Sequence, residues 1–512
     1  MTGAARGALP WWFAWPAAIA GGLLLDVATP SLAWWWAAFP AVALVLAALW
    51  RQRVWDAVGL GAAAGAGFWL PHISWLTLYL GPVPWLALSV VMIAWYALFG
   101  ACAAFATRRL PGIAWPAVTV AGLWVAREQL QGLIPYGGFA WGRLAHTQAE
   151  GPLLQSVSWL GFAGLTGLVA LISAVGVAVY FARPPRKTHA AWCASAVALA
   201  IVAALVPPAP AAREGELKVA AIQGNSKSAI FDDRESGAVL SDHIAATDAL
   251  LRELDKRGER VDVIVWPENS AEFALPDNVL GSQRVARLSK RAKAPIVVGT
   301  ILRDPGDIFT NSTMVWGPEG PLDERYDKRY PVPFAEYMPN REFFHALVPE
   351  LVDLVQLDYT AGQRPAVFEI DTAAGSIRAG LAICFDIIFD QQAVAMVGDG
   401  SEILFAQTNN ADFGRTDESA QQLAIARMRG VETGRVLVNI STVGTSAIVL
   451  PDGTDAASIE PYTEGAMVAT VPLTQGRTPA LVIGAWVAAL WCAAGAAGLV
   501  RAGLQGRIAR RK

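Results

Sequence analysis

Long apolar segments constrain this chain more than any other feature. Seven precede residue 210 and an eighth follows residue 476. Several approach the roughly 20 residues that a helix needs to cross a bilayer. The first cannot be a cleaved signal peptide, because another apolar segment follows it almost at once. The eight predicted transmembrane segments are residues 11–25, 32–50, 54–70, 85–105, 113–125, 157–181, 190–206 and 480–500.

Basic residues predict the orientation of these segments. On an eight-span path, five basic sites fall on one side of the membrane, which the positive-inside rule makes cytoplasmic. We therefore expect a multi-pass protein of the cytoplasmic membrane. Its predicted parts are a membrane domain (1–210), an extracytoplasmic domain (211–476), and an eighth span with a cytoplasmic tail (477–512). The basic sites are Arg6, Arg51 with Arg53, Arg108 with Arg109, Arg183 with Arg186 and Lys187, and residues 501–512.

Composition argues against several other classes of protein. A chain with 54% hydrophobic and 16% charged residues is too apolar for an ordinary soluble protein. A net charge of -3, with no basic cluster interleaved with aromatic residues, indicates no nucleic-acid partner. The five histidines show no metal-ligand spacing with the single cysteine of the extracytoplasmic domain. Neither a metal nor another cofactor is expected.

Residues 211–476 alternate between strand and helix patterns. LKVAAIQGN and VDVIVWPENS each contain an apolar strand, and ESAQQLAIARMRGVETGR has a helical spacing that ends at Gly434. YDKRYPVPFAEYMP, residues 326–339, contains three prolines and is predicted to be a loop. This alternation predicts a layered α/β domain.

The stretch LAICFDIIF, residues 381–389, contains the only cysteine of this domain. If the stretch is a strand, alternate side chains share a face, which predicts that Cys384 and Asp386 point the same way. One interpretation of Cys384 is a small hydrophobic residue packed in a core, as free cysteines often are. The other is a reactive thiol, which is favoured because an exported domain with one cysteine cannot form an internal disulfide.

A thiol nucleophile needs a base, and no histidine lies in a suitable setting. Glu268 follows the apolar strand 261–266, where partial desolvation raises the pKa of a carboxyl group. Lys328 lies in the proline-rich loop, with Glu336 eight residues later. An ammonium group beside the sulfur favours the thiolate and stabilises an oxyanion. The alternatives are an ordinary hydrated carboxylate at Glu268 and a solvated run of charges around Lys328.

The order of these residues carries a resemblance. The chain resembles the nitrilase superfamily, whose Glu-Lys-Cys triad has the same order: a Glu at the end of a strand, a Lys in a loop and a Cys after a later strand. The segments VAAIQGN, VWPENS, DKRYPVPFAEYMP, AICFDIIF, TNNADFG and ARMRGVETGR resemble the apolipoprotein N-acyltransferase family, as does REQLQGLIPYGGFAWGRLAHTQ in the membrane domain. The resemblance covers nearly the whole chain. It implies several spans before an αββα sandwich of the nitrilase type and one span after it.

The resemblance also bears on the surroundings of the nucleophile. It implies that the strand stops near Cys384 and turns into a helix, which conflicts with a shared strand face for Cys384 and Asp386. The family usually has Cys-Tyr-Glu where this chain has Cys384, Phe385 and Asp386. Phe385 lacks the hydroxyl group of Tyr, and Asp386 is one methylene shorter than Glu. We expect both residues to support the pocket.

The reaction implied by the resemblance has two steps. Cys384 attacks an acyl ester of a membrane phospholipid and forms a thioester. The acyl chain then passes to the α-amino group of the N-terminal diacylglyceryl-cysteine of an apolipoprotein. Glu268 is expected to act as general base and then acid, Lys328 as oxyanion stabiliser, and Glu336 as a supporting charge. The expected partners are therefore the phospholipid donor, the apolipoprotein acceptor and membrane lipids.

Two other classes of function remain open. A membrane-tethered amidase would use the same triad with water as the acceptor, although a tether needs only one span. A transporter or a scaffold without catalysis would place ionisable residues deep in its spans, where they are costly and usually functional. Arg127 and Glu128 come near that description.

Overall fold

The computed structural model describes residues 5–226, 237–272 and 274–511. The chain divides into two compact units. Residues 1–209 and 479–512 form the first, which we call the helical unit. Residues 210–478 form the second, which we call the sheet unit.

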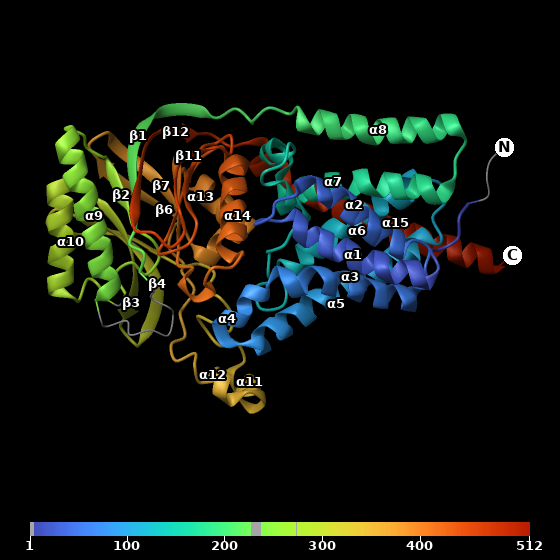
Figure 1. The fold of residues 1–512 in the computed structure, drawn as a ribbon, viewed down its shortest axis with the longest axis horizontal. Helices are drawn as coiled ribbons and strands as arrows, with labels where there is room; N and C mark the ends of the chain where they lie inside the picture. Colours follow the sequence, from blue (N-terminus) through green and yellow to red (C-terminus); the bar gives the residue numbers. More distant parts are fainter. Residues whose placement is uncertain (1–4, 227–236, 273, 512) are drawn as a thin grey trace. The chain divides into compact units, whose positions relative to one another are not determined.

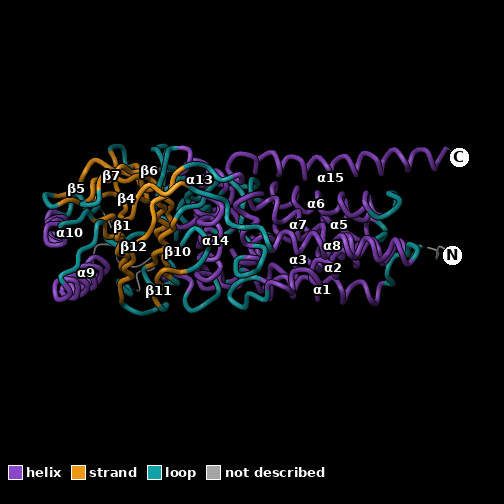
Figure 2. The backbone as a smooth tube through the Cα atoms, turned by 90° about the horizontal axis from the view of Figure 1, so that it is seen from above, coloured by secondary structure: helices purple, strands orange, loops and turns teal. Residues whose placement is uncertain are grey.

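The main part of each of the eight apolar segments lies in a helix of the helical unit, and Figure 2 shows these helices running side by side. A helix satisfies its own backbone hydrogen bonds, which a lipid environment requires. In the described part of the chain, five helical stretches are long and apolar enough to cross a bilayer: α1, α5, Leu154–Ala182, α8 and Pro479–Ile508 of α15. The helices are α1 (Trp11–Ala28), α2 (Ala38–Leu49), α3 (Val54–His72), α4 (Thr77–Leu80), α5 (Pro82–Thr107), α6 (Ala114–Gln131), α7 (Val157–Ala182), α8 (Arg186–Ala204) and α15 (Pro479–Arg511), with short 3-10 helices η1 (Trp35–Ala37), η2 (Ser74–Leu76), η3 (Leu144–Gln148) and η4 (Leu154–Ser156).

Glycines allow α6 and α15 to approach closely. A Cβ atom on Gly122 of α6 would lie 2.4 Å from the carbonyl oxygen of Trp491 and 2.6 Å from the backbone nitrogen of Gly495, both in α15. Small residues permit such backbone contacts in lipid, where the hydrophobic effect does not drive helices together. The last helix of the chain therefore packs against α6, although the sheet unit separates them in sequence.

Arg127 and Glu128 of α6 form a buried ion pair with an N–O distance of 3.1 Å. Glu128 also accepts hydrogen bonds from the backbone N–H of Leu144 and the hydroxyl group of Thr166. The carboxylate of Glu128 therefore connects η3 and α7 to α6, and this buried ion pair contributes to the packing of the helical unit.

The described strands of the sheet unit form two six-stranded sheets. The first has the order β12-β1-β2-β3-β4-β5, and the second has the order β11-β10-β9-β8-β7-β6. The strands are β1 (Ala212–Gln223), β2 (Val263–Val265), β3 (Ile296–Asp304), β4 (Ile308–Gly317), β5 (Gly320–Asp327), β6 (Val367–Thr372), β7 (Gly375–Ile383), β8 (Ile403–Thr408), β9 (Val436–Ser441), β10 (Ser446–Val449), β11 (Asp455–Ile459) and β12 (Gly465–Gln475).

Helices cover the outer face of each sheet, which gives four layers in the order α/β/β/α (Figure 1). The first sheet is covered by α9 (Ala238–Arg257) and α10 (Val279–Ala292), and the second by α13 (Asp390–Gly398) and α14 (Glu418–Thr433). Two short helices, α11 (Arg341–Leu347) and α12 (Pro349–Val352), follow the proline-rich loop. The predicted layered α/β domain is therefore present.

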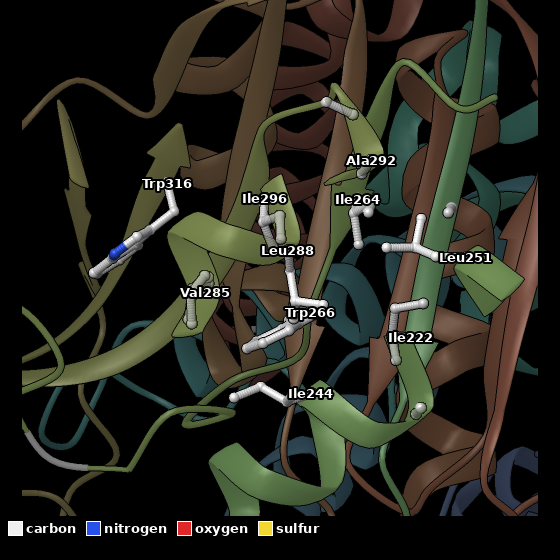
Figure 3. Close-up of a cluster of buried hydrophobic side chains, with 14 of the residues drawn as sticks. Ile222, Ile244, Leu251, Ile264, Trp266, Val285, Leu288, Ala292, Ile296 and Trp316 are labelled. Atoms are coloured by element: carbon white, nitrogen blue, oxygen red, sulfur yellow. The ribbon is translucent and has the colours of Figure 1, made fainter. Parts of the chain in front are cut away.

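The apolar core of the first half lies between the first sheet and its two helices. Ile264 of β2 and Trp266 just after it belong to the same buried cluster as Val285 and Leu288 of the amphipathic helix α10 (Figure 3). Burial of such side chains contributes about 1.5–3 kcal/mol each to folding. This packing fixes the chain just before Glu268.

Parallel pairing brings the polar ends of several strands together. Strand β2 runs parallel to β1 and β3, and β8 runs parallel to β7 and β9. In α/β proteins, ligands bind at the carboxyl ends of such strands. Glu268 follows β2, Cys384 follows β7 and Asn410 follows β8 at these ends.

Candidate active site

The chain turns sharply at Cys384. Strand β7 ends at Ile383, and the 3-10 helix η5 covers Cys384–Ile388. Cys384 has a φ of 48°, in the left-handed region, which costs a residue with a side chain about 1–3 kcal/mol. The prediction that Cys384 and Asp386 share a strand face is wrong, because alternation ends with the strand. The structure has the strand-to-helix turn that the family resemblance implied.

Asp386 ties this turn to the loop that carries Lys328. Its Oδ2 accepts from the hydroxyl group of Tyr326 at 2.8 Å and from the backbone N–H of Ile383 at 3.0 Å, and its Oδ1 accepts from the backbone N–H of Tyr330 at 2.8 Å. Burial raises the pKa of Asp386, although Lys328 and these hydrogen bonds oppose the rise. The carboxyl group of Asp386 therefore joins two segments that are 56 residues apart in the sequence.

Phe385 supports the same turn through apolar contacts. Its ring meets that of Phe389 edge-on, with 5.2 Å between centroids, and Phe389 stacks on Tyr330 at 4.2 Å. The hydroxyl group that Phe385 lacks is therefore not needed for this packing.

We predict that Asp386→Asn lowers turnover in the reaction expected from the sequence roughly tenfold, without abolishing formation of the Cys384 thioester. The amide nitrogen would face an N–H or O–H donor, and a displaced hydrogen bond costs about 1–1.5 kcal/mol. Turnover and the mass of the acylated protein measure the two effects separately. Unchanged turnover would show that the carboxylate is a spectator.

Glu268, Lys328 and Glu336 meet in one buried cluster. The Nζ of Lys328 lies 3.1 Å from Oε1 of Glu268 and 2.9 Å from Oε1 of Glu336. Asn311 bridges the same two oxygens, donating at 2.7 and 2.9 Å. The backbone N–H of Val332 donates to the other oxygen of Glu336 at 2.7 Å. The side chain of Lys328 is 2% exposed and those of both glutamates are 4% exposed, which excludes a hydrated carboxylate and a solvated charge run.

Two carboxylates hold the ammonium group in its charged form. Burial lowers the pKa of Lys328, but the charges of Glu268 and Glu336 outweigh burial and raise this pKa well above its usual value. Burial also raises the pKa of Glu268, with a further rise from Glu336 and an opposing effect from Lys328. The cluster therefore combines a permanent cation with a carboxyl group that takes up a proton readily.

The same surroundings keep Cys384 protonated at rest. Burial raises the pKa of the thiol well above its usual value, and the charge of Glu268 adds to this rise. Lys328 lowers this pKa, as predicted, but does not outweigh burial. A nucleophilic role for this thiol would therefore require removal of its proton during the attack.

Polar residues just after β8 and on α14, which were not identified from the sequence, complete the site. Gln422 donates from Nε2 to Sγ of Cys384 at 3.4 Å. Asn410 donates to Oε1 of Gln422 at 2.8 Å and to Oε2 of Glu418 at 2.7 Å. Glu418 and Gln422 are one helical turn apart, and Asn410 lies in the segment TNNADFG. A search for polar residues in and beside the family motifs could therefore have found all three.

Glu418 predicts a pH dependence of stability. Burial raises its pKa from 4.5 to about 8, with Glu268 adding to the rise and Asn410 opposing it. Between these values the folded protein keeps a proton that the unfolded chain loses, so stability falls as pH rises. In the wild type, the free energy of unfolding should fall by up to about 1.4 kcal/mol per pH unit in this window because of Glu418. Glu418→Gln should abolish this contribution. Unfolding measured across this window should give a flatter profile for the variant, and parallel profiles would contradict the prediction.

Comparison with known proteins defines first the class and then the family. Residues 218–478 match the family model described as carbon-nitrogen hydrolase, so the sheet unit is a nitrilase-like α/β domain. Residues 21–175 match the model described as the apolipoprotein N-acyltransferase N-terminal domain. With both matches in one chain, this protein belongs to the apolipoprotein N-acyltransferase family. The family predicted from the sequence motifs is confirmed.

Similar proteins extend over nearly the whole chain. A relative from Mycolicibacterium smegmatis named apolipoprotein N-acyltransferase is 32% identical over 530 residues, covering 97% of this chain and 86% of the relative. A relative of the same name from Geobacter metallireducens is 30% identical and covers 90% of each chain. Among solved structures, Saccharomyces cerevisiae Nit3, a member of branch 10 of the nitrilase superfamily, is 18% identical with a TM-score of 0.37, covering 51% of this chain and 93% of its own.

Proposed function

We propose that this chain transfers an acyl chain from a membrane phospholipid to the α-amino group of the N-terminal diacylglyceryl-cysteine of apolipoproteins. Its family and the names of its relatives support this activity. The observation that carries the chemistry is the buried cluster of Glu268, Lys328 and Glu336 near the only thiol of the sheet unit.

In the first step, Sγ of Cys384 attacks the acyl ester carbon of the phospholipid. An S–C bond forms, the ester C–O bond breaks, and a lysophospholipid leaves. Glu268 takes the thiol proton and returns it to the leaving alkoxide. Lys328 stabilises the negative oxygen of the tetrahedral intermediate, because its ammonium group stays charged.

In the second step, the α-amino group of the acceptor attacks the thioester carbon. An N–C bond forms, the S–C bond breaks, and the amide product leaves Cys384. Glu268 takes the proton of the amine and returns a proton to the sulfur, so the site is restored. Glu336 positions Lys328 through their 2.9 Å ion pair throughout the cycle.

A labelled acyl phospholipid and a diacylglyceryl peptide test this function. We expect label on the amino group of the peptide, with Cys384→Ala as the inactive control. Free labelled fatty acid without peptide labelling would instead indicate an amidase-like hydrolase. No change in either substrate would contradict enzymatic activity.

We further propose the eight-span arrangement, with the sheet unit outside the cytoplasm. The five basic sites on one side of the path support this topology. It places the nucleophile on the side where both lipid substrates are held.

A reporter fused after Ala212 should therefore be extracytoplasmic, and one fused after Arg501 should be cytoplasmic. Paired fusions in the same strain, scored with reporters active on opposite sides, measure this directly. If both positions report the same compartment, the number of spans is wrong and the placement of the site fails.

A further inference from the structure

Gln422 presents a buried hydrogen-bond donor to the sulfur of Cys384. Its Nε2 lies 3.4 Å from Sγ, and the residue is 2% exposed. It lies one turn after Glu418 on α14, so both side chains lie on the same face of the helix. The amide nitrogen therefore reaches the atom that would react.

A chain of hydrogen bonds fixes the direction of this amide. It starts at the backbone N–H of Gly444, which can only donate, and which donates to Oγ of Ser441 at 2.9 Å. The hydroxyl group of Ser441 then donates to Oδ1 of Asn410 at 2.6 Å. Asn410 donates from Nδ2 to Oε1 of Gln422 at 2.8 Å, which leaves Nε2 of Gln422 to face the sulfur. A reversed amide at Gln422 would set two N–H groups against each other.

Further contacts fix Asn410 in this orientation. Its Nδ2 also donates to Oε2 of Glu418 at 2.7 Å, and its Oδ1 also accepts from the hydroxyl group of Thr408 at 3.1 Å. A Cβ atom on Gly444 would lie 2.3 Å from Oδ1 of Asn410, so a glycine is needed for the loop to close on this amide. The orientation is therefore fixed by the packing of three segments, β8, α14 and the loop 442–445.

We propose that Gln422 is a further catalytic residue, whose side-chain N–H stabilises negative charge on the sulfur of Cys384, and that Asn410 and Ser441 are positioning residues that aim this N–H. The inference rests on the proposed function, in which the sulfur is the nucleophile of the first step and the leaving group of the second. Negative charge develops on the same atom in both steps, so one fixed donor serves both. A neutral donor also offsets part of the free-energy cost of burying the thiolate, without changing the net charge of the cluster.

Alkylation of Cys384 by iodoacetamide tests this proposal independently of lipid substrates. The full chain is purified in detergent, and the rate at Cys384 is followed by peptide mass spectrometry between about pH 6 and pH 9, because the thiolate is the reactive form. Gln422→Met keeps the length of the side chain and removes the donor. We expect a rate about tenfold lower at each pH, which corresponds to a thiol pKa about one unit higher. Gln475→Met, at an exposed position of β12, is the matched control and should keep the wild-type rate.

Ser441→Ala provides a second variant, which removes a link of the chain without touching the sulfur. It should lower the rate in the same direction, by less than Gln422→Met. Wild-type rates in a folded Gln422→Met protein, or an equal loss in Gln475→Met, would overturn the proposal. If Gln422→Met does not fold, a wild-type profile for Ser441→Ala would overturn it. Failure of the wild type to form a thioester with phospholipid would instead contradict the proposed function, whatever the alkylation rates.

Discussion

Cys384→Ser and Cys384→Ala should lose acyl transfer by about 10⁴-fold or more, as expected when the nucleophile of a covalent mechanism is removed. A serine hydroxyl would lack the accessible pKa of a thiol, and Lys328 could do little to ionise it. The proposed thioester would also suit a two-stage transfer, because a thioester reacts with an amine and can wait for the second lipid substrate in a site shielded from water. Turnover of labelled phospholipid and peptide measures the loss.

Both variants should still fold and insert in the membrane, because each substitution changes the side chain by at most one atom. Cys102→Ser in α5 and Cys193→Ser in α8 are matched controls that should keep their activity. Full activity in Cys384→Ala, or a comparable loss in either control, would place the nucleophile elsewhere.

Lys328→Met should abolish turnover and lower the free energy of unfolding by about 3–5 kcal/mol. The ammonium group pairs with Glu268 and Glu336, so its removal leaves two carboxyl groups buried within reach of the same amide, that of Asn311. The developing oxyanion would also lose its cation. Chemical unfolding of the purified variants measures stability, and the acyl-transfer assay measures activity.

A double variant separates these two roles. Lys328→Met with Glu336→Gln removes one unpaired carboxylate, so it should regain part of the lost stability while staying inactive. Recovery of activity in the double variant would show that Lys328 serves only to neutralise Glu336. Unchanged stability in Lys328→Met alone would contradict the buried ion pairs.

Much of the fold could be predicted from local patterns. The main part of each apolar segment is helical, because long runs without polar side chains leave few alternatives in a lipid environment. The alternation of strands and helices indicated the layered α/β domain. The proline-rich loop was predicted from residue 326, but β5 extends to Asp327, so the loop begins two residues later and α11 begins at Arg341. The order of Glu268, Lys328 and Cys384 suggested a common site, with Glu336 as a supporting charge. The structure brings the ammonium group of Lys328 within hydrogen-bond distance of both Glu268 and Glu336.

The remainder depends on tertiary contacts. Alternation failed at Cys384 because a left-handed conformation ends the strand there, and a cysteine gives no local signal for that conformation. Asn410 and Gln422 have no distinctive sequence pattern. Only the packing of the segment after β8 against α14 buries both residues, with Gln422 on the sulfur and Asn410 on Gln422. The raised pKa of the Cys384 thiol is caused mainly by burial. The sequence indicated the charged residues around the thiol but not how deeply it is buried.

The intact mass of the protein after incubation with phospholipid alone tests the central claim most directly. Without an acceptor amine the reaction should stop at the thioester, so the wild-type protein should gain the mass of one acyl chain. Hydroxylamine at neutral pH should remove this mass, and peptide analysis should place it on Cys384. Absence of the adduct in the wild type, or the same adduct in Cys384→Ala, would contradict the assignment of Cys384 as the acyl-carrying nucleophile.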